Sequence, residues 1–170
     1  MKHWAVYPGS FDPFTLGHLD IVQRASGLFD YLLIGVGINI DKQPLFTPEE
    51  RVELIRMSVS HLKNIEVVVY QGLTVKFVQE SGAKIMIRGV RPLTDIPAEL
   101  TMMMANRRLA PEIETLFMIA DGELAHVSSS LIKEIASVAD EKTFSNFLPV
   151  PIVKTVLEKI KATIEISDKA

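Results

Sequence analysis

The sequence predicts an α/β fold in which a five-stranded parallel sheet is flanked by helices. Short apolar runs rich in β-branched residues alternate with segments whose apolar residues recur every three or four positions, and turn residues mark the joins. The chain has 170 residues, of which 48% are hydrophobic, and this is enough for one substantial core. We therefore expect a single domain over residues 1–170, with a polar tail at about 163–170.

The first strand and the first helix are separated by a loop that belongs to neither. Residues 4–7 form the expected strand, and the prolines and glycine of residues 8–13 cannot continue its ladder. A helix is predicted from Gly17 or His18, because the apolar residues that follow fall on one helical face. Those residues are Leu19, Val22, Ala25 and Leu28. Together these segments form the first β-loop-α unit.

The second strand is followed by a strong helix-start signal. The strand is expected at 31–36, and a loop continues through residues 42–46. Thr47 then provides a side-chain N-cap, Pro48 suits the first helical position, and Glu50 can reach back as the capping-box partner. A helix is therefore predicted from Pro48.

The rest of the chain continues the alternation of strands and helices. Further strands are predicted at 65–70, 84–87 and 114–119, and further helices at 74–82, 98–109, from about 131, at 141–147 and at 151–162. The fourth strand runs into the arginine loop of residues 88–91. Residues 127–130 include three serines that can cap the helix beginning near Leu131.

Composition excludes several classes of protein and of site. The chain has no cysteine, which excludes disulfides, thiolate metal sites and cysteine nucleophiles, and its four histidines are too scattered for a zinc cluster. No apolar stretch has the length of a membrane helix, and the N-terminus leads into a strand, so we expect a cytoplasmic protein without a membrane partner. A net charge of −3 gives no general attraction for nucleic acid. A small anionic substrate is therefore expected.

Candidate anion-binding residues follow the carboxyl ends of the predicted strands. Ligands of an open parallel sheet bind at this edge, near the point where the strand order reverses. The residues concerned, in chain order, are Ser10, His18, Lys42, Thr74, Arg88, Arg91 and Ser128–Ser130. Loops on the opposite edge, such as 26–30 and 61–64, contain fewer of them. This asymmetry predicts a single site at one edge of the sheet.

The loop from Tyr7 to His18 suits a phosphate group. A glycine-containing loop that opens a helix offers backbone N–H groups and the positive end of the helix dipole. His18, in the first helical turn, can donate a hydrogen bond to the charge that develops on a reacting phosphorus. The alternative is a histidine packed against the helix start. The neighbouring Thr15 and Gly17 favour the functional interpretation.

The cationic residues each have a structural alternative. Lys42 is either a phosphate contact or a solvated surface lysine. Arg88 and Arg91 flank a glycine and can bind phosphate oxygens bidentately. They can equally form a structural ion pair with Asp95 or Glu99. The sequence leaves these alternatives open.

Two other patterns carry less chemistry, and two known motifs are absent from the sequence. The serines at 128–130 are first a helix cap, and they can also meet phosphate. The run Met102–Met104 suits the core or a subunit interface. The sequence contains neither a Gly-x-x-x-x-Gly-Lys-Ser/Thr loop nor a Gly-x-Gly-x-x-Gly motif, which disfavours a P-loop kinase and a dinucleotide oxidoreductase.

Several motifs match one known family. They are residues 7–13, 15–18, 87–91 and 128–130, with Lys42, 46–51 and 106–107 also in register. By these motifs the chain resembles the bacterial phosphopantetheine adenylyltransferases, of the nucleotidyltransferase superfamily, over roughly its whole length up to the last helix. The Gly17-His18 pair alone indicates only the superfamily, which includes nicotinamide-mononucleotide adenylyltransferases and glycerol-phosphate cytidylyltransferases. The arginine loop and Lys42 narrow the resemblance to this family.

The resemblance implies a doubly wound, Rossmann-like fold and a specific reaction. AMP would pass from ATP to 4′-phosphopantetheine, giving dephospho-coenzyme A and pyrophosphate in coenzyme A synthesis. Mg²⁺ and a homohexamer are also implied, and coenzyme A is a further candidate ligand. Because the acceptor phosphate is already charged, in-line attack needs no general base and no covalent intermediate, only positioning and charge stabilisation. No carboxylate cage is apparent in the sequence, so the metal would be carried by the ATP phosphates.

The resemblance also implies a role for individual residues. His18 would be the catalytic residue, at the transferring α-phosphate. The ATP contacts would be Ser10, Phe11, His18, Gly89, Val90, Arg91, Glu99, Leu124, Ala125, His126, Val127, Ser128, Ser129 and Ser130. The phosphopantetheine contacts would be Ser10, Lys42, Thr74 and Arg88. Ser10 stands where the family often has threonine, which keeps the hydroxyl, whereas Pro97 departs from the family pattern before Glu99 and is expected to alter the local backbone.

Two other functions are compatible with these residues. One is a related nucleotidyltransferase that acts on another phosphate, such as nicotinamide mononucleotide. The other is a nucleotide-sensing protein that keeps the fold without turnover. The combination of His18, Lys42, Arg88 and Arg91 argues against the sensor, because a binding module needs no acceptor clamp beside a donor to the transferring phosphate.

Overall fold

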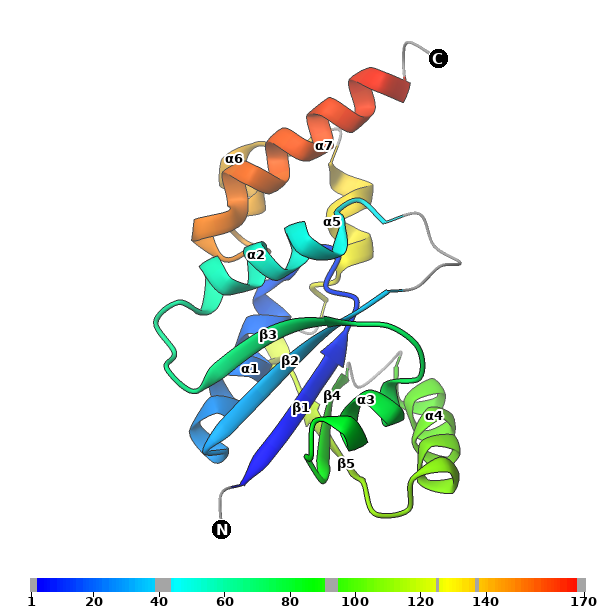
Figure 1. Cartoon of the computed structure of the whole chain (residues 1–170). Coiled ribbons are helices and arrows are strands. Elements are labelled where there is room, and N and C mark those ends of the chain that lie inside the picture. Colours follow the sequence, from blue (N-terminus) through cyan, green and yellow to red (C-terminus); the bar gives the residue numbers. More distant parts are fainter. Residues whose placement is uncertain (1–2, 39–43, 91–94, 125, 137, 168–170) are drawn as a thin grey trace.

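A five-stranded parallel sheet forms the centre of the molecule, which is a computed structural model that describes residues 3–38, 44–90, 95–124, 126–136 and 138–167 (Figure 1). The strands are β1 Trp4–Gly9, β2 Tyr31–Gly37, β3 Ile65–Tyr70, β4 Ile85–Val90 and β5 Glu114–Ile119. Their order is β3-β2-β1-β4-β5, and every pairing is parallel. The strand order therefore reverses between β1 and β4. The predicted α/β fold with five parallel strands is confirmed.

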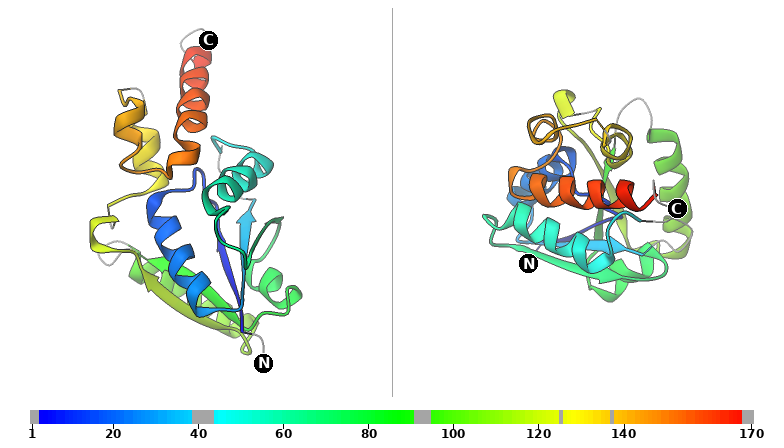
Figure 2. Two further views of the ribbon diagram at one scale, coloured as in Figure 1. Left: turned by 90° about the vertical axis from the view of Figure 1, so that its left-hand side faces the viewer. Right: turned by 90° about the horizontal axis from the view of Figure 1, so that it is seen from above.

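Helices pack on both faces of this sheet (Figure 2). They include α1 Leu16–Leu28, α2 Pro48–Val59, α3 Thr74–Glu80 and α4 Ile96–Leu109. Successive strand residues face opposite sides, and the two hydrophobic clusters follow this alternation. Ala5 and Tyr7 belong to the larger cluster with residues of α1 and α2, whereas Val6 between them packs with residues of α3. The sheet is therefore doubly wound.

The C-terminal helices extend the larger cluster beyond the carboxyl ends of the strands (Figures 1 and 2). They are α5 Ser129–Ile135, α6 Glu141–Phe144, the 3₁₀ turn η2 Val150–Ile152 and α7 Val153–Ser167. Ile132, Phe144 and Val156 are fully buried in this cluster. α6 is shorter than predicted, and α7 continues through Ser167, so part of the segment expected to be a polar tail is helical.

Local sequence explains where two of the helices begin. α2 starts with the predicted capping box, in which the Thr47 hydroxyl accepts the Glu50 N–H at 3.2 Å and Glu50 accepts the Thr47 N–H at 2.8 Å. α4 starts two residues earlier than predicted, and Pro97 lies in its first turn, where proline costs no hydrogen bond. Pro97 therefore fits the helix start and leaves Glu99 in the first turn.

β1 is longer than predicted, and the ladder beside it is not symmetric. It continues through Pro8 and Gly9, which both pair with β2. On its other side, β1 pairs with β4 at Ala5 and Val6. Pro8 lies beyond those two pairs, so its missing N–H is tolerated there, and its carbonyl accepts a hydrogen bond from Arg88 Nη1 at 3.0 Å. The described backbone pairing between β1 and β4 thus stops before the carboxyl ends of these strands and leaves an opening there.

α4 exposes apolar side chains along its length. None of the residues of Ile96–Leu109 is buried. Met102 and Met104 are 56% and 65% exposed, so the core location suggested for the methionine run is wrong for these two residues. Neither α4 nor any other helix in the described residues has the length and apolar character needed to cross a membrane.

Candidate active site

A buried aromatic side chain shapes the loop after β1. Phe11 has a φ of 50°, a left-handed conformation that costs a non-glycine residue roughly 1–2 kcal/mol. Its ring packs against those of Tyr7, Phe14 and His18, with centroids 5.3, 5.8 and 5.1 Å away. Gly9 allows this arrangement, because a Cβ there would lie 2.8 Å from the Phe11 ring. Since the ring is buried, any contact of Phe11 with ATP would involve its backbone.

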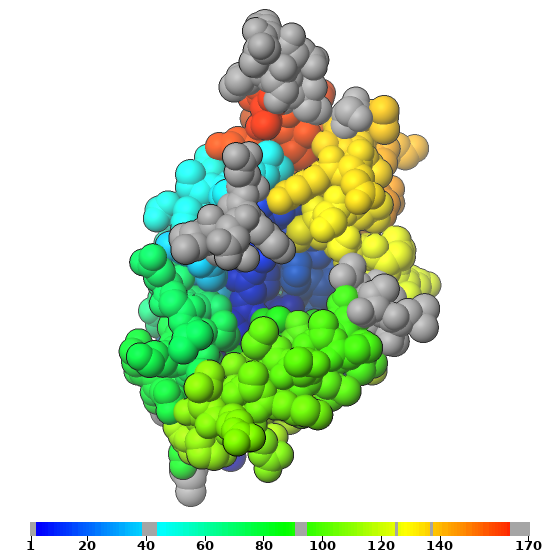
Figure 3. Space-filling view, turned by 90° about the vertical axis from the view of Figure 1, so that its right-hand side faces the viewer, coloured from blue at the N-terminus to red at the C-terminus, as the bar shows by residue number. Residues whose placement is uncertain are grey.

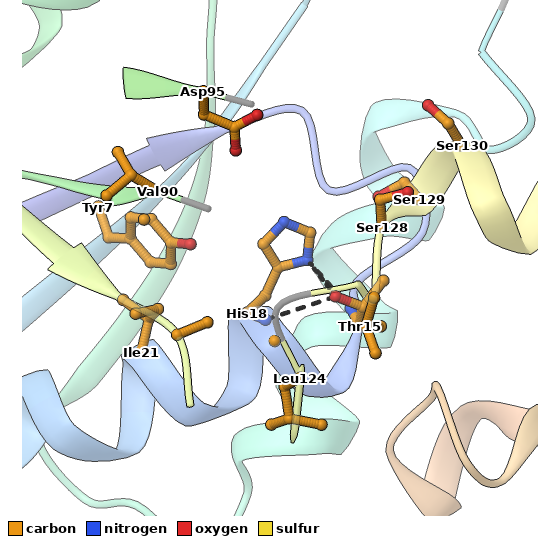
Figure 4. A pocket seen from close by; sticks show the side chains of 14 residues that line it. Tyr7, Thr15, His18, Ile21, Val90, Asp95, Leu124, Ser128, Ser129 and Ser130 are labelled. Carbon is orange, nitrogen blue, oxygen red and sulfur yellow. Dashed lines mark hydrogen bonds between the residues drawn. The ribbon is translucent and has the colours of Figure 1, made fainter. Parts of the chain in front are cut away.

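His18 is oriented by a second capping box, at the start of α1. The Thr15 backbone N–H donates to His18 Nδ1 at 3.1 Å, and the Thr15 hydroxyl lies 3.0 Å from the same nitrogen. Because Nδ1 accepts a hydrogen bond from a backbone N–H, a neutral His18 carries its proton on Nε2. The ring stacks on Phe14 and projects into a cavity (Figure 4). His18 thus borders that cavity with Nδ1 held by Thr15, and its role in transfer stays a prediction.

The cavity beside His18 has a volume of about 230 Å³, and we call it the α1 hollow. It is lined by Tyr7, Thr15, Gly17, His18, Ile21, Gly89, Val90, Asp95, Ala120, Leu124, Val127 and Ser128–Ser130. In Figure 4, His18 lies between Tyr7 on one side and the serines on the other. Helix-start N–H groups, a histidine donor and hydroxyl groups therefore converge on one space.

The serine run joins this hollow to the loop after β1. The Ser128 hydroxyl accepts the Leu131 N–H at 3.1 Å and caps α5, so the predicted cap is confirmed. The Ser129 hydroxyl donates to the Pro13 carbonyl at 2.8 Å. The start of α5 is therefore hydrogen-bonded to the loop that carries Phe11, and Ser128–Ser130 line the α1 hollow.

A second, larger cavity of about 530 Å³ lies beside the start of α3, and we call it the α3 hollow. It is lined by Gly9, Ser10, Gly37, Ile38, Tyr70, Gln71, Gly72, Thr74 and Arg88. Arg88 and Gly89 are successive residues of β4, yet they line different hollows, because neighbouring strand residues face opposite sides. The two hollows therefore lie on the two sides of the opening between β1 and β4. Figure 3 shows the blue N-terminal segment at the bottom of the depression, between green and yellow segments.

Arg88 forms a partly buried ion pair with Glu99 of α4. Its Nε donates to Glu99 Oε2 at 2.8 Å and its Nη2 donates to Glu99 Oε1 at 2.6 Å. Burial alone would lower the pKa of Arg88, but the hydrogen bonds and charge of Glu99 outweigh burial and raise it. Arg88 therefore stays charged, and the ion pair that the sequence left open as an alternative is present.

Asp12 ties three segments together behind the two hollows. Its buried carboxylate accepts the backbone N–H groups of Leu45 and Phe46, both at 2.9 Å. Lys133 of α5 donates to the same carboxylate at 2.5 Å. Asp12 thus connects the loop after β1, the segment before α2 and the helix that follows the serine run.

Arg51 of α2 also contacts the loop after β1, through a hydrogen bond to the backbone carbonyl of Ser10. It is 3% exposed, and its guanidinium donates to the carbonyls of Ser10 at 2.8 Å, Gly37 at 3.3 Å and Thr47 at 3.4 Å. Sequence reasoning assigned no role to Asp12, Arg51 or Lys133. An acidic residue in a proline-containing loop is a recognisable acceptor for backbone N–H groups, but nothing near Lys133 in the sequence indicates its partner.

Most predicted site residues lie at the predicted edge of the sheet. The α1 hollow contains His18, Gly89, Val90, Leu124, Val127 and Ser128–Ser130, and the α3 hollow contains Ser10, Thr74 and Arg88. The exposed His126 has its ring 6.0 Å from that of Phe147, and Glu99 pairs with Arg88. Lys42, Arg91 and Ala125 lie outside the described residues. Tyr7 and Asp95 line the α1 hollow although no contact with a substrate was predicted for them.

A family model and the relatives of similar sequence indicate one family, and a solved structure shares the fold. Residues 6–135 match the model of cytidylyltransferase-like proteins. The phosphopantetheine adenylyltransferase of Rhodopirellula baltica is 54% identical over 93% of this chain and 89% of its own length. That of Heliobacterium modesticaldum is 46% identical over 94% of both chains. A solved structure from Vibrio parahaemolyticus, assigned as a nicotinate-nucleotide adenylyltransferase, covers 94% of this chain and 95% of its own with a TM-score of 0.67; its 19% identity shows a common fold alone.

Proposed function

The chain belongs to the phosphopantetheine adenylyltransferases, and from this premise we propose that it transfers AMP from ATP to 4′-phosphopantetheine. The products are dephospho-coenzyme A and pyrophosphate, which places the reaction in coenzyme A biosynthesis. ATP, phosphopantetheine and dephospho-coenzyme A are thus its small-molecule partners, with coenzyme A as a further candidate ligand. We assign the activity to the cytoplasm.

The observation that carries this proposal is the pair of hollows at the opening between β1 and β4. A transfer between two phosphorylated substrates needs two binding spaces that meet at the reacting phosphorus. The α1 hollow offers His18 and the start of α1 to the nucleotide, and the α3 hollow offers Arg88 and Thr74 to the acceptor. The ends of β1 and β4 border both hollows, because Gly9 and Arg88 line one of them and Tyr7 and Gly89 line the other.

The reaction requires positioning and charge stabilisation, and no covalent intermediate. The acceptor phosphate attacks the α-phosphorus of ATP directly, the new P–O bond forms, and the bond to the departing pyrophosphate breaks on the opposite side. His18 Nε2–H donates to a non-bridging oxygen whose charge grows in the transition state. Arg88, together with Lys42, holds the acceptor phosphate in line with the phosphorus.

We assign Mg²⁺ to the phosphates of ATP rather than to a protein cage. Among the described residues no group of three histidine or acidic side chains is arranged to hold a metal ion, and Asp95 is the carboxylate that lines the α1 hollow. When bound, Mg²⁺ neutralises charge on the pyrophosphate. Asp95 is suited to contact the hydrated ion, because hard cations of this kind usually keep several waters.

A homo-oligomer, with the hexamer as the expected form, accords with the surface of α4. Ile96, Leu100, Met102, Met104 and Leu109 are exposed on this helix. Ile96, Leu100 and Met104 are spaced four residues apart and so share one helical face, and an exposed apolar face is typical of subunit interfaces. Light scattering of the purified protein checks the state directly, and a monomer at micromolar concentration would contradict it.

An acceptor panel tests the proposed function. We expect pyrophosphate release from ATP when 4′-phosphopantetheine is present, and background release with nicotinamide mononucleotide or without an acceptor. CTP in place of ATP should support little release. Equal turnover with nicotinamide mononucleotide would instead support a related nucleotidyltransferase, and ATP binding without release would support the sensor.

Replacing Gly89 with alanine should weaken nucleotide binding. A Cβ at Gly89 would lie 2.8 Å from the hydroxyl oxygen of Tyr7, whose burial raises its pKa and keeps it protonated. The methyl group would displace that hydroxyl or push into the α1 hollow. We expect the KM for ATP to rise about tenfold and stability to fall by about 1–3 kcal/mol, as overpacking of a dense site does.

Steady-state kinetics with one substrate varied at a time measures this effect. Gly27→Ala is a suitable control, because a Cβ at Gly27 meets no atom within 4 Å and alanine favours the α1 helix. An unchanged KM for ATP in Gly89→Ala would show that Tyr7 and Gly89 do not border the nucleotide.

A further inference from the structure

Two charged side chains of α1 are hydrogen-bonded to the segment that follows β5. Asp20 and Arg24 lie four positions apart on the helix and form an ion pair at 3.0 Å. Nη1 of Arg24 also donates to the carbonyl of Ile119 at 2.7 Å. The Asp20 oxygen of the ion pair accepts the backbone N–H of Asp121 at 3.2 Å. The pair, which we call the α1 clamp, therefore holds the backbone on both sides of Ala120.

The segment held by the α1 clamp leads directly into one wall of the α1 hollow. Asp121 precedes the 3₁₀ turn η1 Gly122–Leu124, and its carbonyl accepts the Leu124 N–H at 2.8 Å. The Leu124 carbonyl in turn accepts the Val127 N–H at 2.9 Å. Ala120, Leu124 and Val127 all line the hollow. Consecutive backbone hydrogen bonds thus connect the α1 clamp to this wall.

The same wall lies against the start of α1, beside His18. A Cβ on Gly17 would lie 3.7 Å from the carbonyl oxygens of Leu124 and Val127, which is van der Waals contact. α1 carries His18 in its first turn and the α1 clamp in its second and third turns. One rigid helix therefore holds both His18 and the segment that leads into the facing wall.

We propose that Asp20 and Arg24 are positioning residues for the nucleotide, which hold the wall formed by Ala120 and Leu124 in place around the α1 hollow. The ion pair itself contributes little, because its side chains are 20% and 47% exposed. The two hydrogen bonds to backbone atoms carry the effect. They restrict the segment before ATP binds, so less conformational freedom is lost on binding. This inference rests on the proposed function and deepens it on the nucleotide side.

A double-mutant cycle of Asp20→Ala and Arg24→Ala tests the inference. In each single variant we expect the KM for ATP to rise about fivefold, as the loss of one hydrogen bond allows, with the acceptor KM and kcat within about twofold of wild type. The double variant should show a smaller rise than the product of the two single effects, because both side chains hold one segment. Titration calorimetry with ATP alone should give a matching rise in Kd. Asp20→Asn keeps an acceptor oxygen for the Asp121 N–H and should show a smaller rise, and it provides the reading if the alanine variants do not fold.

Arg56→Ala is the matched control, because Arg56 makes the same kinds of contact on α2. It pairs with Glu53 of its own helix at 2.8 Å and donates to the strand carbonyl of Val67 at 3.1 Å, and none of these three residues lines either hollow. Its loss should leave both KM values unchanged.

Three results would overturn the inference. The first is a KM for ATP that stays at the wild-type value in both single variants, and the second is an equal rise in the KM values of both substrates. The third is a rise in Arg24→Ala with none in Asp20→Ala, which would assign the effect to the charge of Arg24 alone. Failure of the wild-type protein to use phosphopantetheine would overturn the proposed function instead, and the Kd for ATP would still test the α1 clamp.

Discussion

Replacing His18 with alanine is expected to lower kcat by about two orders of magnitude or more, while the KM for ATP stays within about threefold of wild type. Loss of one donor to a developing oxyanion typically costs about 10²–10³ in kcat, because the contact is stronger in the transition state than in the ground state. The geometry supports such a contact, since the Thr15 N–H occupies Nδ1 and leaves Nε2 to carry the proton. Pyrophosphate release at saturating phosphopantetheine measures the effect.

The same substitution removes one half of the capping box of α1, and this structural effect must be separated from chemistry. His18→Gln keeps a side-chain oxygen that can accept the Thr15 N–H, so it should restore thermal stability without restoring kcat. His61→Ala is the matched histidine control, because His61 is exposed and lies beside Gln23, away from both hollows. A loss confined to KM, or a kcat of His18→Ala close to that of wild type, would contradict the assigned role.

Replacing Asp12 with alanine should destabilise the whole protein and abolish most activity. The change leaves two backbone N–H groups and the Lys133 ammonium without their buried acceptor. Removing one partner from such a site costs about 3–5 kcal/mol, which for a chain of this length lowers the Tm by roughly 10 °C or more. The loops that border both hollows would lose their common support. Calorimetry and steady-state kinetics on the same preparation measure the two effects.

Asp140→Ala provides the comparison for an ordinary capping aspartate. Asp140 is exposed and caps α6 by accepting the Thr143 N–H at 2.8 Å. Its removal should lower stability only by the loss of one exposed helix cap, and activity should be retained. Asp12→Asn should lie between the two, because the amide keeps one acceptor oxygen but loses the charge that pairs with Lys133. A melting curve of Asp12→Ala that matches Asp140→Ala would show that the network contributes little.

The elements that the sequence predicted well are those whose positions are determined by residues close together in the chain. Apolar periodicity placed the strands, and the spacing of Thr47 and Glu50 placed the start of α2. Thr15 and His18 have the same spacing, but histidine is not the usual partner at that position, so this second capping box was not predicted. β1 was predicted two residues too short. Proline fits a strand where its missing N–H is not needed by a partner strand, and the local sequence does not specify that partner.

The site was predictable to the level of one sheet edge. Parallel strands place all their carboxyl ends together, so Ser10, His18, Thr74 and Arg88 could be assigned to one region from chain order alone. The pairing of Arg88 with Glu99 rather than Asp95 depends on the rotation of α4, which Pro97 helps to set. The contact between Asp12 and Lys133 joins residues 121 positions apart, and no local pattern indicates it.

The uneven ladder around β1 has a mechanical consequence. Hydrogen bonds along adjacent strands resist sliding and twisting. In the described ladder β1 pairs with β2 along its whole length, whereas its backbone pairs with β4 are at Ala5 and Val6. The sheet is therefore most compliant along a seam at its centre, and the two hollows open on either side of that seam. A ligand that fills both hollows restrains the two halves of the sheet against movement relative to each other. Amide protons of β1 and β4 near the seam should thus gain the most protection from exchange when both substrates are bound.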